Sequence, residues 1–123
     1  MTAKMAAMVL GIVFVLIGLL GFVNNPVLGM FLVNPVHNLV HLISGIVLLA
    51  GAYSSLGSRM ALKIIGVVYA LIAILGFFLV TADGMLLGII AMNEGDKWLH
   101  VVLAAVILAA AFGLPDDDRA TAM

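Results

Sequence analysis

The feature that most constrains this sequence is a set of four long apolar runs with uncharged interiors. Each run is close to the roughly 20 helical residues that cross the hydrocarbon core of a bilayer. Strands are not favoured, since polar and apolar residues do not alternate and the runs are too long for barrel strands. Helices also satisfy every backbone polar group internally where water is absent. The four predicted spans cover residues 5–23, 35–53, 61–80 and 97–114.

The composition agrees with that of an integral membrane protein. Hydrophobic residues make up 66% of the 123 residues and charged residues 9%, against roughly 45–50% and 25% in an ordinary soluble domain. A soluble domain of this size cannot hide so much apolar surface. The net charge of -1 argues against a nucleic-acid partner. The absence of cysteine excludes disulfides, thiolate metal sites and cysteine nucleophiles.

The basic residues predict the orientation of the spans. Lys4, Arg59, Lys63 and Arg119 fall on one side of the predicted bilayer, and Lys97 falls alone on the other. Short loops rich in Lys and Arg stay in the cytoplasm. We therefore expect a multi-pass protein of the bacterial cytoplasmic (inner) membrane with both termini inside. The first run is longer than the apolar core of a signal peptide, so it is expected to be retained.

The two halves of the chain resemble each other. Residues 11–22 align with residues 66–77 at an offset of 55, and after a four-residue insertion the alignment resumes at an offset of 59. At that second offset Asn34 falls on Asn93 and His41 falls on His100. The chain is thus predicted to be one membrane domain, residues 1–123, made of two parallel repeats and a tail. The repeats cover about 5–53 and 61–114, and the polar cytoplasmic tail covers 115–123.

Small residues recur at matched positions of the repeats. Small side chains let helix backbones approach closely in lipid, where no hydrophobic effect drives helix association. We therefore predict an all-α fold, a compact four-helix transmembrane bundle of two hairpins. Leu, Ile and Val are expected to face lipid, and helix packing is expected at Gly11, Gly18, Gly21, Gly45, Gly66, Ala73, Gly76 and Ala104.

Polar residues gather where two apolar connections, 24–34 and 81–96, enter the second and fourth spans. These connections are too short to cross a bilayer and are predicted to be interfacial or re-entrant. Asn34, followed by Pro35, and Asn93 are expected to cap the helices. His37 and His41 are four residues apart and so share one helix face. The predicted polar cluster is Asn34, His37, Asn38, His41, Asn93, Asp96 and His100.

These blocks carry a family resemblance. Residues 33–42 contain the pattern Asn-Pro-x-His-Asn-x-x-His, and Asn93, Asp96 and His100 form an Asn-x-x-Asp-x-x-x-His block that departs from the pattern at Lys97. Both resemble the hallmarks of an uncharacterised family of small bacterial four-helix membrane proteins. The resemblance extends from about Val9 to Gly113. It implies the topology and supplies no activity, because that family is a domain of unknown function.

Two interpretations of the histidines stay open. In the structural one they hydrogen-bond with the neighbouring Asn and Asp side chains and fix the packing of the two halves, because polar networks in low dielectric specify one arrangement. In the other, His37, His41 and His100 ligate a metal ion, with Asp96 or Glu94 completing the site. One histidine from each half would equally suit a haem or chlorophyll-type tetrapyrrole, for which Gly45 and Ala104 leave room.

Transport and catalysis are less well supported. Ser44 is the one clearly polar side chain near the middle of a span, whereas pumps and carriers usually carry ionisable groups there. No phosphate-binding loop and no nucleophile with a placed base is evident. We therefore predict a non-enzymatic accessory or structural subunit, or an oligomer-forming module, packed against other membrane proteins or itself and binding no cofactor. A histidine-based metal or tetrapyrrole protein is the alternative.

Overall fold

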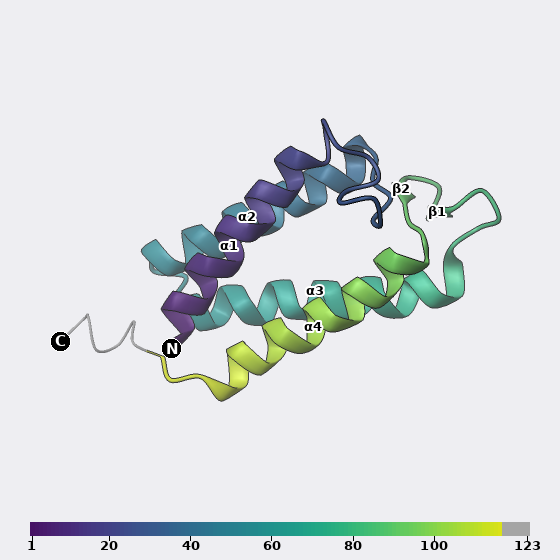
Figure 1. The fold of residues 1–123 in the computed structure, drawn as a ribbon. Coiled ribbons are helices and arrows are strands. Elements are labelled where there is room, and N and C mark those ends of the chain that lie inside the picture. The colour runs from purple at the N-terminus through teal and green to yellow at the C-terminus, as the bar shows by residue number, and fades with distance from the viewer. Residues whose placement is uncertain (117–123) are drawn as a thin grey trace.

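The computed structural model describes residues 1–116 and is all-helical, as the sequence predicts. It contains α1 (Ala3–Leu20), α2 (Pro35–Tyr53), α3 (Ser58–Leu79) and α4 (Glu94–Gly113), shown in Figure 1. Each helix is long and apolar enough to cross a membrane. The one addition is a short antiparallel pair, β1 (Met85–Leu86) and β2 (Ile90–Ala91), in the last connection. Within the expected tail, residues 117–123 lie outside the described part of the chain.

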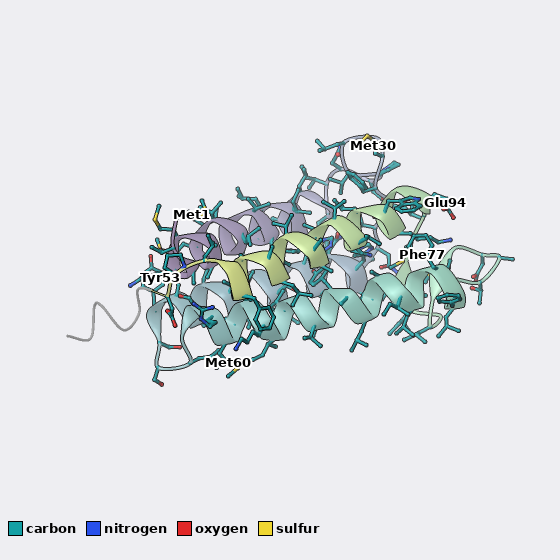
Figure 2. The ribbon with its side chains drawn as sticks, turned by 90° about the horizontal axis from the view of Figure 1, so that it is seen from below. Met1, Met30, Tyr53, Met60, Phe77 and Glu94 are labelled. Atoms are coloured by element: carbon teal, nitrogen blue, oxygen red, sulfur yellow. The ribbon has the colours of Figure 1, made fainter. Side chains whose placement is uncertain are left out.

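The four helices form two antiparallel hairpins, α1 with α2 and α3 with α4 (Figure 1). The N-terminus, the α2–α3 connection and the end of α4 lie at one end of the bundle, and the α1–α2 and α3–α4 connections lie at the other (Figures 1 and 2). We call the second end the distal end. Large apolar side chains cover the outside of all four helices, as expected for surfaces that face lipid.

Glycines set the close approach of the helices in the first hairpin. A Cβ on Gly45 would lie 2.6 Å from the backbone oxygen of Gly11, and a Cβ on Gly18 would lie 3.0 Å from the backbone oxygen of Asn38. In the second hairpin the neighbour is a side chain, since a Cβ on Gly66 would lie 2.6 Å from a methyl group of Leu108. The two backbones of the first hairpin are therefore in direct contact.

The helix ends differ from the predicted spans by a few residues. The first helix stops at Leu20 rather than residue 23, because a turn begins at Gly21. The third helix begins three residues before the predicted start and includes Arg59. The guanidinium of Arg59 reaches across to the end of α4, where it donates to the carbonyl oxygens of Ala111 and Leu114. The Arg59 guanidinium therefore caps the C-terminal end of the neighbouring helix α4.

The helices that begin at the distal end are both capped by asparagine. The Asn34 side chain accepts a hydrogen bond from the backbone N–H of His37 at 3.0 Å, and Pro35 occupies the first helical position. The Asn93 side chain accepts from the N–H of Asp96 at 2.9 Å, while the Asp96 carboxylate accepts from the N–H of Asn93 at 3.0 Å. This reciprocal capping box starts α4 at Glu94, earlier than the predicted residue 97.

The two distal connections have matching backbones. Leu28 and Leu87 both have φ of 54°, and the glycines that follow them have φ of 73° and 72°. These two pairs lie 59 residues apart, which is the offset of the sequence alignment. Alternate side chains of each connection are turned into the bundle, so that Val27 and Leu86 are buried while the leucine after each points outward. The connections therefore cover the distal end of the bundle.

The interior changes character along its length. Alanine, leucine and isoleucine from all four helices fill it toward the chain termini. Toward the distal end buried polar side chains join the apolar ones, and aromatic rings lie beside them. The buried polar residues of the described chain are His37, Asn38, His41, Ser44, Ser58, Asp96 and His100.

Candidate metal centre

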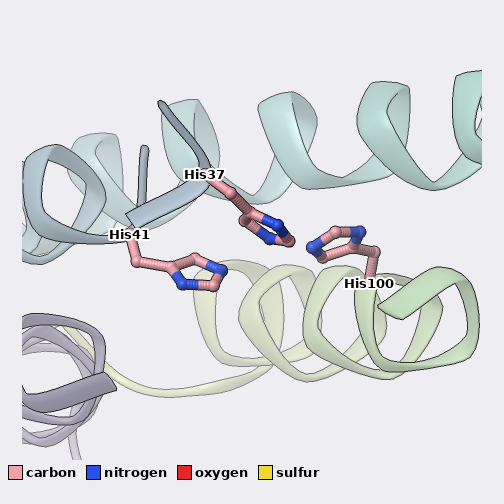
Figure 3. Close-up of side chains that lie close together, drawn as sticks. All are labelled: His37, His41 and His100. Atoms are coloured by element: carbon pink, nitrogen blue, oxygen red, sulfur yellow. The ribbon is translucent and has the colours of Figure 1, made fainter. Parts of the chain in front are cut away.

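Three histidines meet in the interior of the distal half. His37 and His41 project from one face of α2, and His100 projects toward them from α4 (Figure 3). All three side chains are buried, and each contributes a ring nitrogen to a set that lies within 4.8 Å of one another. We call these residues the histidine cluster. The His37 and His41 ring centroids are 4.6 Å apart, and the His100 ring lies 5.5 Å from that of His37.

The hydrogen bond of His37 fixes its protonation. Its Nδ1 lies 2.7 Å from the backbone oxygen of Ala91. A carbonyl oxygen only accepts, so Nδ1 carries the proton and donates it. In the neutral ring Nε2 then carries a free lone pair, and this nitrogen is buried without a hydrogen-bond partner among the described residues. Metal-binding histidines are usually oriented in this way, with one nitrogen bonded to a carbonyl and the other presented to the ion.

The other two rings also carry unpartnered nitrogens. Nδ1 of His41 and Nδ1 of His100 are buried, and neither has a hydrogen-bond partner among the described residues. Buried polar atoms are nearly always hydrogen-bonded in folded proteins. Three such nitrogens in one cluster are therefore unusual, and they indicate a site where a ligand could bind.

Two aromatic rings that were not among the predicted site residues pack against the cluster. Phe14 of α1 packs against His41 at 6.0 Å between centroids, and Tyr69 of α3 packs against His100 at 5.7 Å. The Tyr69 hydroxyl is 3.1 Å from the Ser44 hydroxyl, which also donates to the backbone oxygen of Val40 at 2.7 Å. The signal was present in the repeat, because residues 14 and 69 are aligned at the offset of 55.

The acidic residues proposed as further ligands do not join the cluster. Within residues 1–116 the group of side chains placed to share one ion consists of the three histidines. The carboxylate of Asp96 is buried but accepts the backbone N–H of Asn93. Glu94 is exposed and pairs with Lys97 at 2.7 Å. The expectation that Asp96 or Glu94 completes the ligand set is therefore wrong for this arrangement, because both serve the start of α4.

The asparagines of the predicted polar cluster take separate positions. Asn34 and Asn93 cap their helices and lie above the histidines. Asn38 is buried against α1, where its Oδ1 occupies the space that a side chain at Gly21 would need. That oxygen has no hydrogen-bond partner among the described residues. Asn38 thus packs between helices rather than pairing with the imidazoles.

The space beside Gly45 does not hold a flat macrocycle. Gly45 was expected to leave room for such a ring, but α1 fills that space, with the Gly11 oxygen 2.6 Å and a Val15 methyl 2.7 Å from a Cβ built there. In a tetrahedral zinc site with bonds of about 2.0 Å, neighbouring ligand atoms are ~3.4 Å apart. The largest separation between the three nitrogens, 4.8 Å, would therefore have to close by about 1.4 Å for all three to bind one ion.

The fold and the cluster define a class, a multi-pass membrane protein of four apolar helices with a buried polar interior at one end. The family model described as "Domain of unknown function (DUF4383)" matches residues 4–113. The chain belongs to this family, which confirms the family resemblance predicted from the two motif blocks. Comparisons with curated proteins and with solved structures gave no match.

Proposed function

We propose that this membrane protein binds a single transition-metal ion in the histidine cluster. The observation that supports the proposal best is the meeting of three buried imidazoles whose ring nitrogens lie within 4.8 Å of one another. Neutral imidazole is the commonest protein ligand for such ions. His37 has the orientation of a ligand, with Nδ1 bonded to Ala91 and a free lone pair on Nε2.

The ligand set favours zinc or copper among the metals. All three donors are nitrogen, and the chain has no cysteine to add sulfur. Imidazole donors suit Zn²⁺ and copper, whereas Mg²⁺ and Ca²⁺ prefer oxygen. Three protein ligands leave a fourth position of a tetrahedral ion for water or another small ligand. We therefore expect Zn²⁺ or Cu⁺, which the experiment below distinguishes.

A purely structural histidine network is less well supported. Such a network gains its energy from hydrogen bonds among its members, and partly satisfied networks are costly in low dielectric. In the histidine cluster the three ring nitrogens Nε2 of His37, Nδ1 of His41 and Nδ1 of His100 are buried and form no hydrogen bond among the described residues. An ion would use these nitrogens, and it would also join α2 to α4.

We propose a binding role rather than catalysis. The acidic groups nearest the cluster are already engaged, since Asp96 caps its helix and Glu94 pairs with Lys97. Both carboxylates thus have partners at the start of α4. The Ser44 hydroxyl likewise donates to the carbonyl of Val40 in its own helix. The protein is thus proposed to be non-enzymatic.

Metal analysis of purified protein tests the proposal. Protein purified in mild detergent, stripped with chelator and reloaded separately with Zn²⁺ and Cu⁺, is expected to retain one ion of the preferred metal per chain. His41→Ala and His100→Ala should each lose it, whereas Ser44→Ala, which removes a neighbouring buried polar group, should retain it. Metal retained by both single variants, His41→Ala and His100→Ala, would contradict the proposal. A wild-type protein that holds neither metal would contradict it as well.

The orientation and the duplication are further parts of this proposal. Lys4, Arg59 and Lys63 lie toward the end that carries the N-terminus, and Lys97 lies at the distal end, a distribution that supports cytoplasmic termini in the bacterial cytoplasmic membrane. The matching φ angles of Leu28 and Leu87 support an origin from two copies of one hairpin.

A role as a subunit of a larger membrane assembly is a second candidate. Helices and short connections take up nearly all of residues 1–116, so contact with a partner would take place largely within the bilayer. Phe78 and Phe112 are exposed aromatic side chains on α3 and α4 that such a partner would cover. Native mass spectrometry in mild detergent tests this role, with a complex of fixed stoichiometry expected. A stable lone monomer would contradict it.

A further inference from the structure

The seam between α1 and α4 is the loosely packed side of the bundle. These two helices come together much less closely than the helices within each hairpin. A cavity of about 180 Å³ lies in the seam at its distal end, between α1, α4 and the connection that follows α1. A second cavity of about 350 Å³ lies nearer the termini. Leu10 lines both cavities, so the two are neighbours along the seam.

The walls of the distal cavity are apolar apart from two side chains. His41 and Asp96 are its polar lining residues, and both are buried, at 4% and 1% exposure. Nδ1 of His41 has no hydrogen-bond partner among the described residues. The lining nearer the termini consists of apolar side chains such as Val9, Leu10 and Val106. A molecule that fits the seam is therefore mainly apolar, with a single polar group placed beside His41.

The size of the distal cavity indicates what carries that polar group. An apolar protein cavity of about 150 Å³ holds one benzene molecule. The distal cavity is slightly larger, so it has room for one six-membered ring with a hydroxyl group. A plain acyl chain would fill the same space but would leave Nδ1 of His41 without a partner, which is costly away from water. A hydroxyl group both donates and accepts.

We propose that the seam binds a phenol that carries a long apolar chain. The ring fills the distal cavity with its hydroxyl toward His41 and Asp96, and the chain lies along the seam past Leu10. This ligand is distinct from the metal ion of the proposed function, but its hydroxyl pairs with the same His41 side chain that would ligate the ion, so the two ligands are tested separately. The ligand binds from the lipid side of the bundle.

Native mass spectrometry of the metal-free full chain tests the inference, with 4-dodecylphenol and dodecylbenzene as probes. We expect one 4-dodecylphenol per chain and about tenfold weaker retention of dodecylbenzene, the effect of losing one buried hydrogen bond. Leu99→Trp should abolish binding by filling the cavity from α4. Val13→Phe should do so from α1, in case the first variant does not fold. The matched control is Val102→Trp, an exposed position of α4 outside the lining, and it should bind normally.

The outcomes separate this inference from the metal proposal. Equal retention of the two probes would overturn it, because the seam would then hold acyl chains without selection. Normal binding by folded Leu99→Trp and Val13→Phe would also overturn it. A wild-type chain that holds a metal ion but no phenol would overturn this inference alone. A chain that holds the phenol but no metal would support it and contradict only the proposed metal site.

Discussion

Asn34 and Asn93 exchange equivalent hydrogen bonds between the two hairpins. The side-chain amide of Asn34 donates to the backbone oxygen of Ile89 at 2.9 Å, and that of Asn93 donates to the backbone oxygen of Met30 at 2.9 Å. Each asparagine also uses its side-chain oxygen to cap its own helix. The two residues therefore fix the helix starts and join the hairpins directly above the histidine cluster.

The two roles of Asn34 predict different costs for two substitutions. Asn34→Ser keeps an oxygen for the cap but loses the donor to Ile89, so the free energy of unfolding should fall by about 1 kcal/mol. Asn34→Ala loses both hydrogen bonds, so it should lower the free energy of unfolding by about 2 kcal/mol. Unfolding of the protein in mixed detergent micelles measures both values. A serine variant as stable as the wild type would show that the bond to Ile89 contributes nothing.

Gly45 should tolerate no larger side chain. Gly45→Ala places a methyl group 2.6 Å from the backbone oxygen of Gly11 and should lower the free energy of unfolding by about 2 kcal/mol. Gly113→Ala is the matched control, because a Cβ on Gly113 meets no atom within 4 Å. The same micelle assay compares the two. Equal stability of both variants would contradict the close contact of α1 with α2.

Arg59 should not be replaceable by lysine. Its planar guanidinium bridges the oxygens of Ala111 and Leu114, and Asp116 lies 3.7 Å from its Nε. A lysine offers one point charge and no fork. Arg59→Lys should therefore speed hydrogen exchange near the end of α4 and at Ala3, whose N–H donates to the oxygen of Pro115 at 2.8 Å. Unchanged exchange at both places would contradict this role of Arg59.

Single cysteines should report the orientation, because the natural chain has none. Met30 is an exposed residue of the first distal connection, and Leu56 is an exposed residue of the α2–α3 connection. In intact cells a membrane-impermeant maleimide should label Met30→Cys and leave Leu56→Cys unlabelled until the cells are lysed. The reverse pattern would place the termini outside.

The sequence predicted the number, class and approximate bounds of the helices because apolar length alone decides them in a bilayer. It placed the start of the third helix at residue 61 rather than Ser58, since Arg59 was assigned to the loop before the span, whereas it lies in α3 and its side chain bonds the end of α4. It did not predict the β1–β2 pair, whose two-residue strands carry too little pattern to detect.

The candidate site was predictable in part, because residue spacing and the repeat indicate which side chains can meet. The spacing of His37 and His41 and the repeat position of His100 suggested that they meet, and the structure brings them together. The repeat also aligned Phe14 with Tyr69, but only the packing shows that these rings contact His41 and His100. The use of Asp96 as a cap rather than a ligand depends on backbone geometry that composition and spacing do not contain.

X-ray absorption at the zinc edge is the most direct test of the central claim, that one ion is held by imidazoles from both hairpins. Protein loaded with one Zn²⁺ should show a first shell that includes three imidazole nitrogens at about 2.0 Å, and His100→Ala should remove one of them or release the metal. A shell of oxygen atoms with fewer than two imidazoles, unchanged in His100→Ala, would contradict the account.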